Sequence, residues 1–102
     1  MHEWPFVDPP DLAVITLTRI LTGESSICLV THDDDDESWQ FLDGEHAFEH
    51  AAAVVGLGEM LEFDPTLAVL ADLPLGWYAW RASTDADWQR AEGEPPADLI
   101  SS

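Results

Sequence analysis

Apolar and polar residues alternate along much of this chain with a spacing of two, which is typical of β-strands. The run from 12 to 21 is rich in β-branched residues, and a second alternating run extends from 26 to 32. The residues between these runs, 22–25, contain glycine, serine and threonine and read as a turn. We therefore expect the two runs to pair as an antiparallel hairpin.

The middle of the chain contains another strand and a stretch that fits two interpretations. Residues 39–42 read as a short strand, closed by the turn pair Asp43-Gly44. In the next stretch the alanines favour a helix, whereas the adjacent valines favour a buried strand. We expect a helical turn at 45–50 followed by a strand at 52–57.

The second half of the chain has clearer signals for where its helices and strands begin and end. Residues 58–63 read as a helical turn or two, and the pair Asp64-Pro65 is a typical helix start, with Asp as N-cap and Pro at the first helical position. Pro74 ends this helix. Residues 76–83 then form a final strand that carries three large aromatic side chains.

These segments predict a single α+β domain spanning 1–102. Its small antiparallel sheet has about four to five strands, with two short helices packed on one face. A chain of 102 residues leaves no room for two independent cores. The three prolines of 1–11 predict an extended N-terminal segment that docks on the body through its aromatic residues, and 92–102 reads as a loosely ordered tail.

Charge separates this chain from an ordinary globular sequence. It has 21 acidic residues against three arginines and no lysine, for a formal net charge of −18. Such a surface repels nucleic acid and anionic membranes, and it attracts basic proteins. General solubility, as in halophiles, is the alternative explanation of the acidity. No basic segment precedes an apolar stretch at the N-terminus, and no run approaches 18 apolar residues, so we expect a cytoplasmic location.

The densest negative charge lies in one run between two predicted strands, comprising Asp33, Asp34, Asp35, Asp36 and Glu37. Like charges on adjacent residues do not suit a sheet, so this run is expected to be a solvated loop. The spaced carboxylate pattern of a calcium loop is absent, and consecutive side chains should diverge rather than converge on one ion. The functional interpretation is a rim that docks against arginines or lysines of a partner.

Aromatic side chains offer a second candidate contact surface, formed by Trp39, Trp77 and Trp80. Alternation places Trp77 and Ala79 on one face of the last strand and Trp80 on the other. Core packing explains one face, and the other face is available for a partner or for homodimerisation. Arg81, among so many acids, is expected to be ion-paired.

One short motif suggests enzyme chemistry instead. His46, Glu49 and His50 match the pattern H-x-x-E-H, in which two histidines one helical turn apart bind zinc. The motif lacks a third ligand and a long helix, so a small metal-dependent hydrolase is the alternative rather than the favoured function. Cys28 lies in an apolar run and is expected to be a buried, inert thiol.

Three segments together resemble a known family. They are Ser-Trp-Gln-Phe-Leu-Asp-Gly-Glu at 38–45, Leu-Gly-Glu-Met-Leu-Glu-Phe-Asp-Pro at 57–65, and Leu-Pro-Leu-Gly-Trp-Tyr-Ala-Trp-Arg at 73–81. The arrangement, which covers about half the chain from 34 to 81, resembles a bacterial domain family of unknown function whose members include immunity proteins of polymorphic toxin systems. The resemblance implies a small non-enzymatic protein that neutralises a toxin by binding it.

The sequence therefore predicts a protein-binding domain without cofactor or catalytic residues. The partner would be a basic protein, and the resemblance makes an immunity-type inhibitor of a basic toxin the leading candidate. The small hydrolase and a homodimeric accessory protein are the alternatives.

Overall fold

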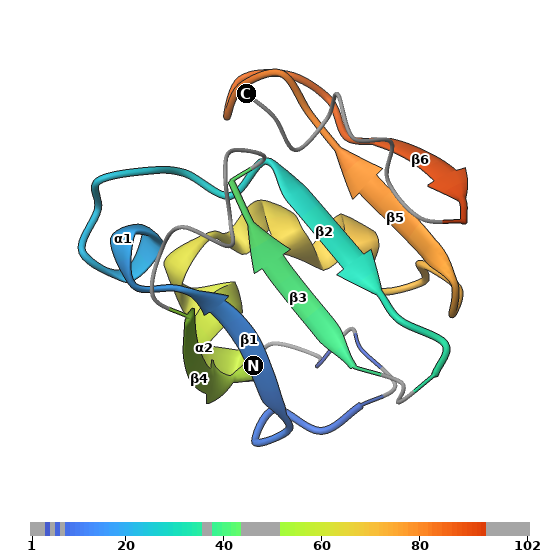
Figure 1. The fold of residues 1–102 in the computed structure, drawn as a ribbon, viewed down its shortest axis with the longest axis horizontal. Coiled ribbons are helices and arrows are strands. Elements are labelled where there is room, and N and C mark those ends of the chain that lie inside the picture. Colours follow the sequence, from blue (N-terminus) through green and yellow to red (C-terminus); the bar gives the residue numbers. More distant parts are fainter. Residues whose placement is uncertain (1–3, 5, 7, 36–37, 44–51, 94–102) are drawn as a thin grey trace.

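The computed structural model describes residues 4, 6, 8–35, 38–43 and 52–93 (Figure 1). Within these residues the chain forms six strands: β1 (Ala13–Leu17), β2 (Leu29–His32), β3 (Trp39–Leu42), β4 (Ala52–Gly56), β5 (Trp77–Trp80) and β6 (Gln89–Glu92). It also forms three short helices: α1 (Thr18–Leu21), α2 (Leu57–Phe63) and the 3₁₀ helix η2 (Pro65–Leu70). The protein is thus an α+β domain, as its sequence predicts.

The strands form one mixed sheet in the order β4-β1-β3-β2-β5-β6. All neighbouring pairs are antiparallel except β1 and β3, which are parallel. The hydroxyl of Thr16 reinforces that parallel pair by donating to the carbonyl oxygen of Phe41 at 2.8 Å. The sheet therefore has more strands than the four to five expected, and it is not purely antiparallel.

The predicted hairpin between the first two alternating runs is wrong. The first run is not one strand, because it turns into α1 at Thr18, and β3 lies between β1 and β2 in the sheet. Alternation specifies which face of a strand is buried but carries no information about which strand lies beside it. The apolar pattern therefore predicted strand positions correctly without predicting this pairing.

Other predicted elements are confirmed. Strands β3, β4 and β5 and helix α2 form where the sequence places them, within a residue or a few. The Asp64 side chain accepts from the backbone N–H of Thr66 at 3.1 Å, as an N-cap does. The helix that follows is 3₁₀ and ends at Leu70, before Pro74. Strand β6 was not predicted, and the helical turn expected at 45–50 lies outside the described residues, as do 94–102.

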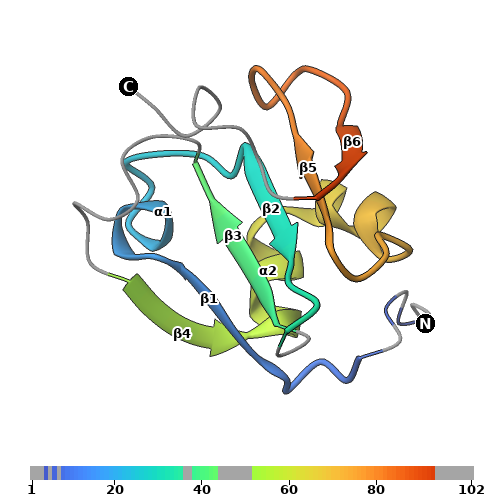
Figure 2. The same cartoon turned by 45° about the vertical axis from the view of Figure 1, so that its right-hand side comes forward.

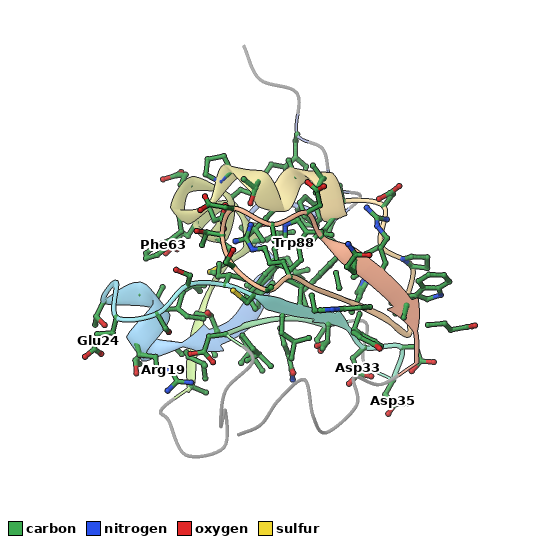
Figure 3. All side chains as sticks on the ribbon, turned by 90° about the horizontal axis from the view of Figure 1, so that it is seen from above. Arg19, Glu24, Asp33, Asp35, Phe63 and Trp88 are labelled. Carbon is green, nitrogen blue, oxygen red and sulfur yellow. The ribbon has the colours of Figure 1, made fainter. Side chains whose placement is uncertain are left out.

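The core lies between the sheet and two of the helices. Figure 3 shows α2 and η2 together on one face of the sheet. The strand register aligns Val30, Phe41 and Ala79 in a row, and all three are fully buried. Phe6 from the N-terminal segment joins this core and packs edge-on against Trp39 with ring centroids 5.2 Å apart. The expected docking of that segment through its aromatic residues is confirmed at this position.

A buried arginine connects β5 to the start of η2. The Arg81 side chain is 2% exposed, and its Nη2 lies 2.6 Å from Oδ2 of Asp64. Its Nε and Nη2 also donate to the carbonyl oxygen of Ile27, at 2.9 and 2.7 Å. The guanidinium carbon lies 4.3 Å from the centroid of the Trp88 ring. The expected ion pairing of Arg81 is thus confirmed, and it fixes the end of β5 relative to two other segments.

Within the described part of the chain, no helix has the length and apolar character needed to cross a membrane.

Candidate functional site

A cavity of about 460 Å³ opens where β2 ends and β5 begins. Its lining comes from three strands and the turn after β2, and it comprises Thr31, His32, Asp33, Asp34, Asp35, Gln40, Leu42, Gly76, Trp77 and Gly93. We call this cavity the acidic pocket. It includes three of the five residues of the predicted acidic rim, while Asp36 and Glu37 lie outside the described residues.

Two glycines bring the walls of the acidic pocket together. The backbone N–H of Gly76 donates to the carbonyl oxygen of His32, and that of Gly93 donates to the carbonyl oxygen of Gly76, both at 2.7 Å. Both glycines have positive φ, 81° and 100°, which a residue with a side chain rarely adopts. A Cβ on Gly76 would also lie 3.4 Å from Oδ2 of Asp34. The glycines thus permit the tight junction that places the aspartates beside β5.

The three aspartates converge at the rim. Asp33 is held by its backbone N–H, which donates to the carbonyl oxygen of Ser38 at 2.9 Å, and its side chain accepts from the N–H of Asp35 at 2.9 Å. This Asx turn folds the chain back, so that carboxylate oxygens of Asp33, Asp34 and Asp35 lie within 4.8 Å of one another. The expectation that consecutive acidic side chains diverge is therefore wrong for these three. Figure 3 shows Asp33 and Asp35 pointing outward at one end of the sheet.

The chain's own arginines are engaged elsewhere. Each pairs with an aspartate outside the acidic pocket: Arg19 with Asp43, Arg81 with Asp64, and Arg90 with Asp72, with N–O distances of 2.5, 2.6 and 2.8 Å. Since the sequence has no lysine, no lysine or arginine side chain of the molecule neutralises Asp33, Asp34 and Asp35 in the described structure. The negative charge of the acidic pocket is therefore directed at solvent.

A histidine and a tryptophan support the base of the acidic pocket. His32 stacks on Trp39 with ring centroids 3.8 Å apart, and its Nδ1 lies 2.8 Å from the carbonyl oxygen of Leu73. A carbonyl oxygen only accepts, so Nδ1 carries the proton of this hydrogen bond. Trp39 is 1% exposed and donates through Nε1 to Oδ2 of Asp8 at 3.0 Å. Its ring thus belongs to the core and offers no surface to a partner.

The other two candidate tryptophans lie in different surroundings. Trp77 is half-buried and is one of the residues that line the acidic pocket. Trp80 is also half-buried, but it lies at the far end of β5 and packs against Tyr78 with centroids 5.3 Å apart. The structure therefore brings Trp77 together with the acidic rim and leaves Trp80 apart from it.

The groups around the acidic pocket suit cation binding better than covalent chemistry. They include carboxylates, the Gln40 amide and the Thr31 hydroxyl. Burial raises the pKa of the Cys28 thiol, and nearby Arg81 offsets this only in part, so the thiol stays protonated at neutral pH. The alternative zinc motif of His46, Glu49 and His50 lies outside the described residues.

Sequence reasoning found the aspartates and Trp77 but missed the remainder of the acidic pocket. Gly76 carries a recognisable signal, since a glycine that follows Pro74 and precedes an aromatic strand is typical of a turn. Gly93 has no such signal, because its position depends on β6, which the sequence did not predict. Gln40 and Thr31 occupy neighbouring positions only through the register of β2 with β3.

Comparisons with known proteins found no matching family model, no matching curated protein and no matching solved structure. The function must therefore be inferred from the acidic pocket and from the charge of the molecule.

Proposed function

We propose that this chain is a non-enzymatic protein-binding domain that receives a cationic side chain of a basic partner in the acidic pocket. The resemblance to immunity proteins makes a basic toxin the leading candidate partner, which the chain would neutralise by binding. In this role Asp33, Asp34 and Asp35 supply the attraction, and Trp77 helps to form the wall of the acidic pocket.

The observation that carries the proposal is the convergence of three carboxylates that no arginine or lysine of the described structure neutralises, at a cavity that Trp77 helps to line. A guanidinium or ammonium group placed there would donate charge-assisted hydrogen bonds to the carboxylates. A purely solubilising surface needs neither a cavity nor convergent carboxylates. The geometry therefore favours specific binding over general solubility.

The charge of the molecule supports the same conclusion at longer range. A formal net charge of −18 attracts a basic protein before contact and raises the rate of encounter, most strongly at low salt. The attraction decays over a Debye length of about 8 Å at physiological ionic strength. Long-range attraction would bring the partner near, and the acidic pocket would then fix its orientation.

Capture from the organism's own cells tests this function with three baits. They are the wild type, a pocket variant (Asp33→Asn, Asp34→Asn, Asp35→Asn) and a control variant (Glu62→Gln, Asp85→Asn, Asp87→Asn). The control residues are exposed and outside the acidic pocket, and both variants remove the same number of charges. We expect a basic protein on the wild-type and control baits and its loss from the pocket variant. Equal capture by the two variants, or no basic protein on any bait, would reject the function.

If the captured protein arrests growth when expressed alone, co-expression distinguishes an immunity protein from a general binder. We expect the wild type and the control variant to restore growth and the pocket variant to restore little. Full rescue by the pocket variant would assign neutralisation to another surface.

A further inference from the structure

Strand β4 forms one edge of the sheet, and within the described residues it pairs with β1 alone (Figure 2). The N–H of Leu57 donates to the carbonyl oxygen of Leu12 at 2.9 Å, which fixes the hydrogen-bonding phase of this antiparallel pair. Hydrogen-bonded and non-hydrogen-bonded positions alternate along such a pair. The backbone groups of Ala53 and Val55 therefore face β1, whereas those of Ala52, Val54 and Gly56 face outward.

Among the residues that the structure describes, this edge lacks the usual protection against pairing with another chain. Edge strands in soluble proteins are normally protected by charged residues, proline or bulges. Strand β4 reads Ala-Ala-Val-Val-Gly, without charge or proline, and the Val54 side chain is 70% exposed. The opposite edge differs, because β6 carries Arg90 and Glu92. An uncharged edge in a chain of charge −18 is a local exception that favours strand addition.

Charge indicates what kind of strand fits this edge. A second copy would bring two molecules of charge −18 together, which opposes self-association. Acidic residues also flank one end of β4: a Cβ on Gly56 would lie 3.6 Å from Oε1 of Glu59 and 4.0 Å from Cα of Asp11, and both residues are exposed. In an antiparallel added strand, the residue opposite Gly56 would therefore meet carboxylates, and the residue opposite Val54 would meet an apolar side chain.

We propose that β4 accepts an extended segment of a basic partner protein by antiparallel strand addition, with an apolar residue opposite Val54 and a lysine or arginine opposite Gly56. The proposal rests on the proposed function for the basic character of the partner. It names a second contact: in the sheet, β1 and β3 lie between β4 and β2, the strand that leads into Asp33, Asp34 and Asp35. The two contacts can therefore be tested separately.

A short peptide serves as the probe. Acetyl-Thr-Lys-Thr-Val-Thr-Val-Thr-amide, placed antiparallel to β4, sets its lysine opposite Gly56 and its first valine opposite Val54. An NMR titration follows the backbone amides of 52–56. We expect these amides to shift in the wild type, and the affinity to fall by about tenfold when the first valine is N-methylated, because this removes one inter-strand donor.

Substitution of Val54 provides the matched test on the protein. Val54→Pro removes the outward N–H and leaves the bonds between β4 and β1 intact, so we expect about tenfold weaker peptide binding. Val54→Thr keeps the backbone donor and the β-branched shape, and its affinity should stay within about threefold of wild type. If the Val54→Pro variant fails to fold, the comparison of the N-methylated and parent peptides on the wild type still tests strand addition.

Several results would overturn the inference. The first is the absence of shifts in the amides of 52–56, and the second is equal binding of the N-methylated and parent peptides. The third is a dimer mass by light scattering that Val54→Pro converts to a monomer mass, because this result would make a second copy the occupant of the edge. The pocket variant should bind the peptide almost as the wild type does. Peptide binding that disappears in the pocket variant but not in Val54→Pro would reject strand addition and leave the proposed function standing. If the peptide binds by strand addition but the pocket variant still captures the partner as the wild type does, only the role of the acidic pocket in binding is rejected.

Discussion

Replacing Arg81 by methionine tests whether its buried guanidinium fixes the end of β5 to the rest of the domain. The substitution keeps an unbranched side chain of similar length and removes every polar contact of the arginine. Asp64 loses its ion-pair partner at 2.6 Å, and the Ile27 carbonyl oxygen loses two donors. The cation–π contact with Trp88 is lost as well.

The magnitude follows from the burial of these groups. Removing one partner of a fully buried ion pair typically lowers the free energy of unfolding by about 3–5 kcal/mol. The Asp64 side chain is 19% exposed, so water partly solvates its carboxylate after the substitution and the lower end applies. We therefore expect Arg81→Met to lower the free energy of unfolding by about 3 kcal/mol, a large part of the roughly 5–15 kcal/mol of an average domain.

Urea unfolding followed by tryptophan fluorescence measures this loss, with Asp64→Asn and the double variant completing a thermodynamic cycle. Asn at 64 can still accept from Thr66 and carries no charge to leave unpaired. The double variant should therefore lose less than the sum of the two single variants, by about 1–2 kcal/mol. A loss below about 1 kcal/mol for Arg81→Met, or strict additivity in the cycle, would refute the reasoning.

Three further outcomes follow from the charges and burial of the chain. Burial would raise the pKa of Asp64, but hydrogen bonds from Thr66 and Arg81 outweigh it and hold that pKa below its usual value. The stabilisation by ionised Asp64 is thus present above its unfolded pKa of about 3.9 and is lost as pH falls through the lower folded pKa. The free energies of unfolding of the wild type and of Asp64→Asn should therefore converge in acid. A difference that stays constant with pH would contradict this. Cys28 is half-buried, and this burial raises the pKa of its thiol, so iodoacetamide at pH 8 should alkylate the folded chain at least about tenfold more slowly than the urea-unfolded chain; equal rates would be inconsistent with a raised pKa. Salt should raise the melting temperature because it screens the repulsion among acidic residues in a chain of net charge −18. A fall in melting temperature would show that attraction within the ion pairs outweighs this repulsion.

Local sequence signals determined most of the secondary structure. The Asp64-Pro65 pair predicted the start of a helix because capping depends only on neighbouring residues, and the alternation at 39–42 matches β3. Thr18 was the exception: its β-branched neighbours favour a strand, yet the chain enters α1 there. Intrinsic β-propensity is weak compared with tertiary packing. Ile20 of α1 is fully buried, so packing of this side chain outweighs the β-propensity of the segment.

The pairing of strands that are distant in the chain could not be predicted from the sequence. The parallel neighbours β1 and β3 are joined by a connection that contains β2, and nothing in their alternation identifies them as partners. The same limit applies to the acidic pocket. The charge of Asp33, Asp34 and Asp35 was visible in the sequence, but their convergence depends on an Asx turn, and their position beside Trp77 depends on the pairing of β2 with β5.

The measurement that most directly tests the acidic pocket is a calorimetric titration with a blocked tri-arginine peptide at low and high salt. The wild type, the pocket variant and the control variant are compared. We expect the wild type and the control variant to bind within about twofold of each other, and the pocket variant to bind at least about fivefold more weakly at low salt, since only it loses the convergent carboxylates. Equal weakening of the two variants would contradict the account and would assign the acidity of the chain to solubility.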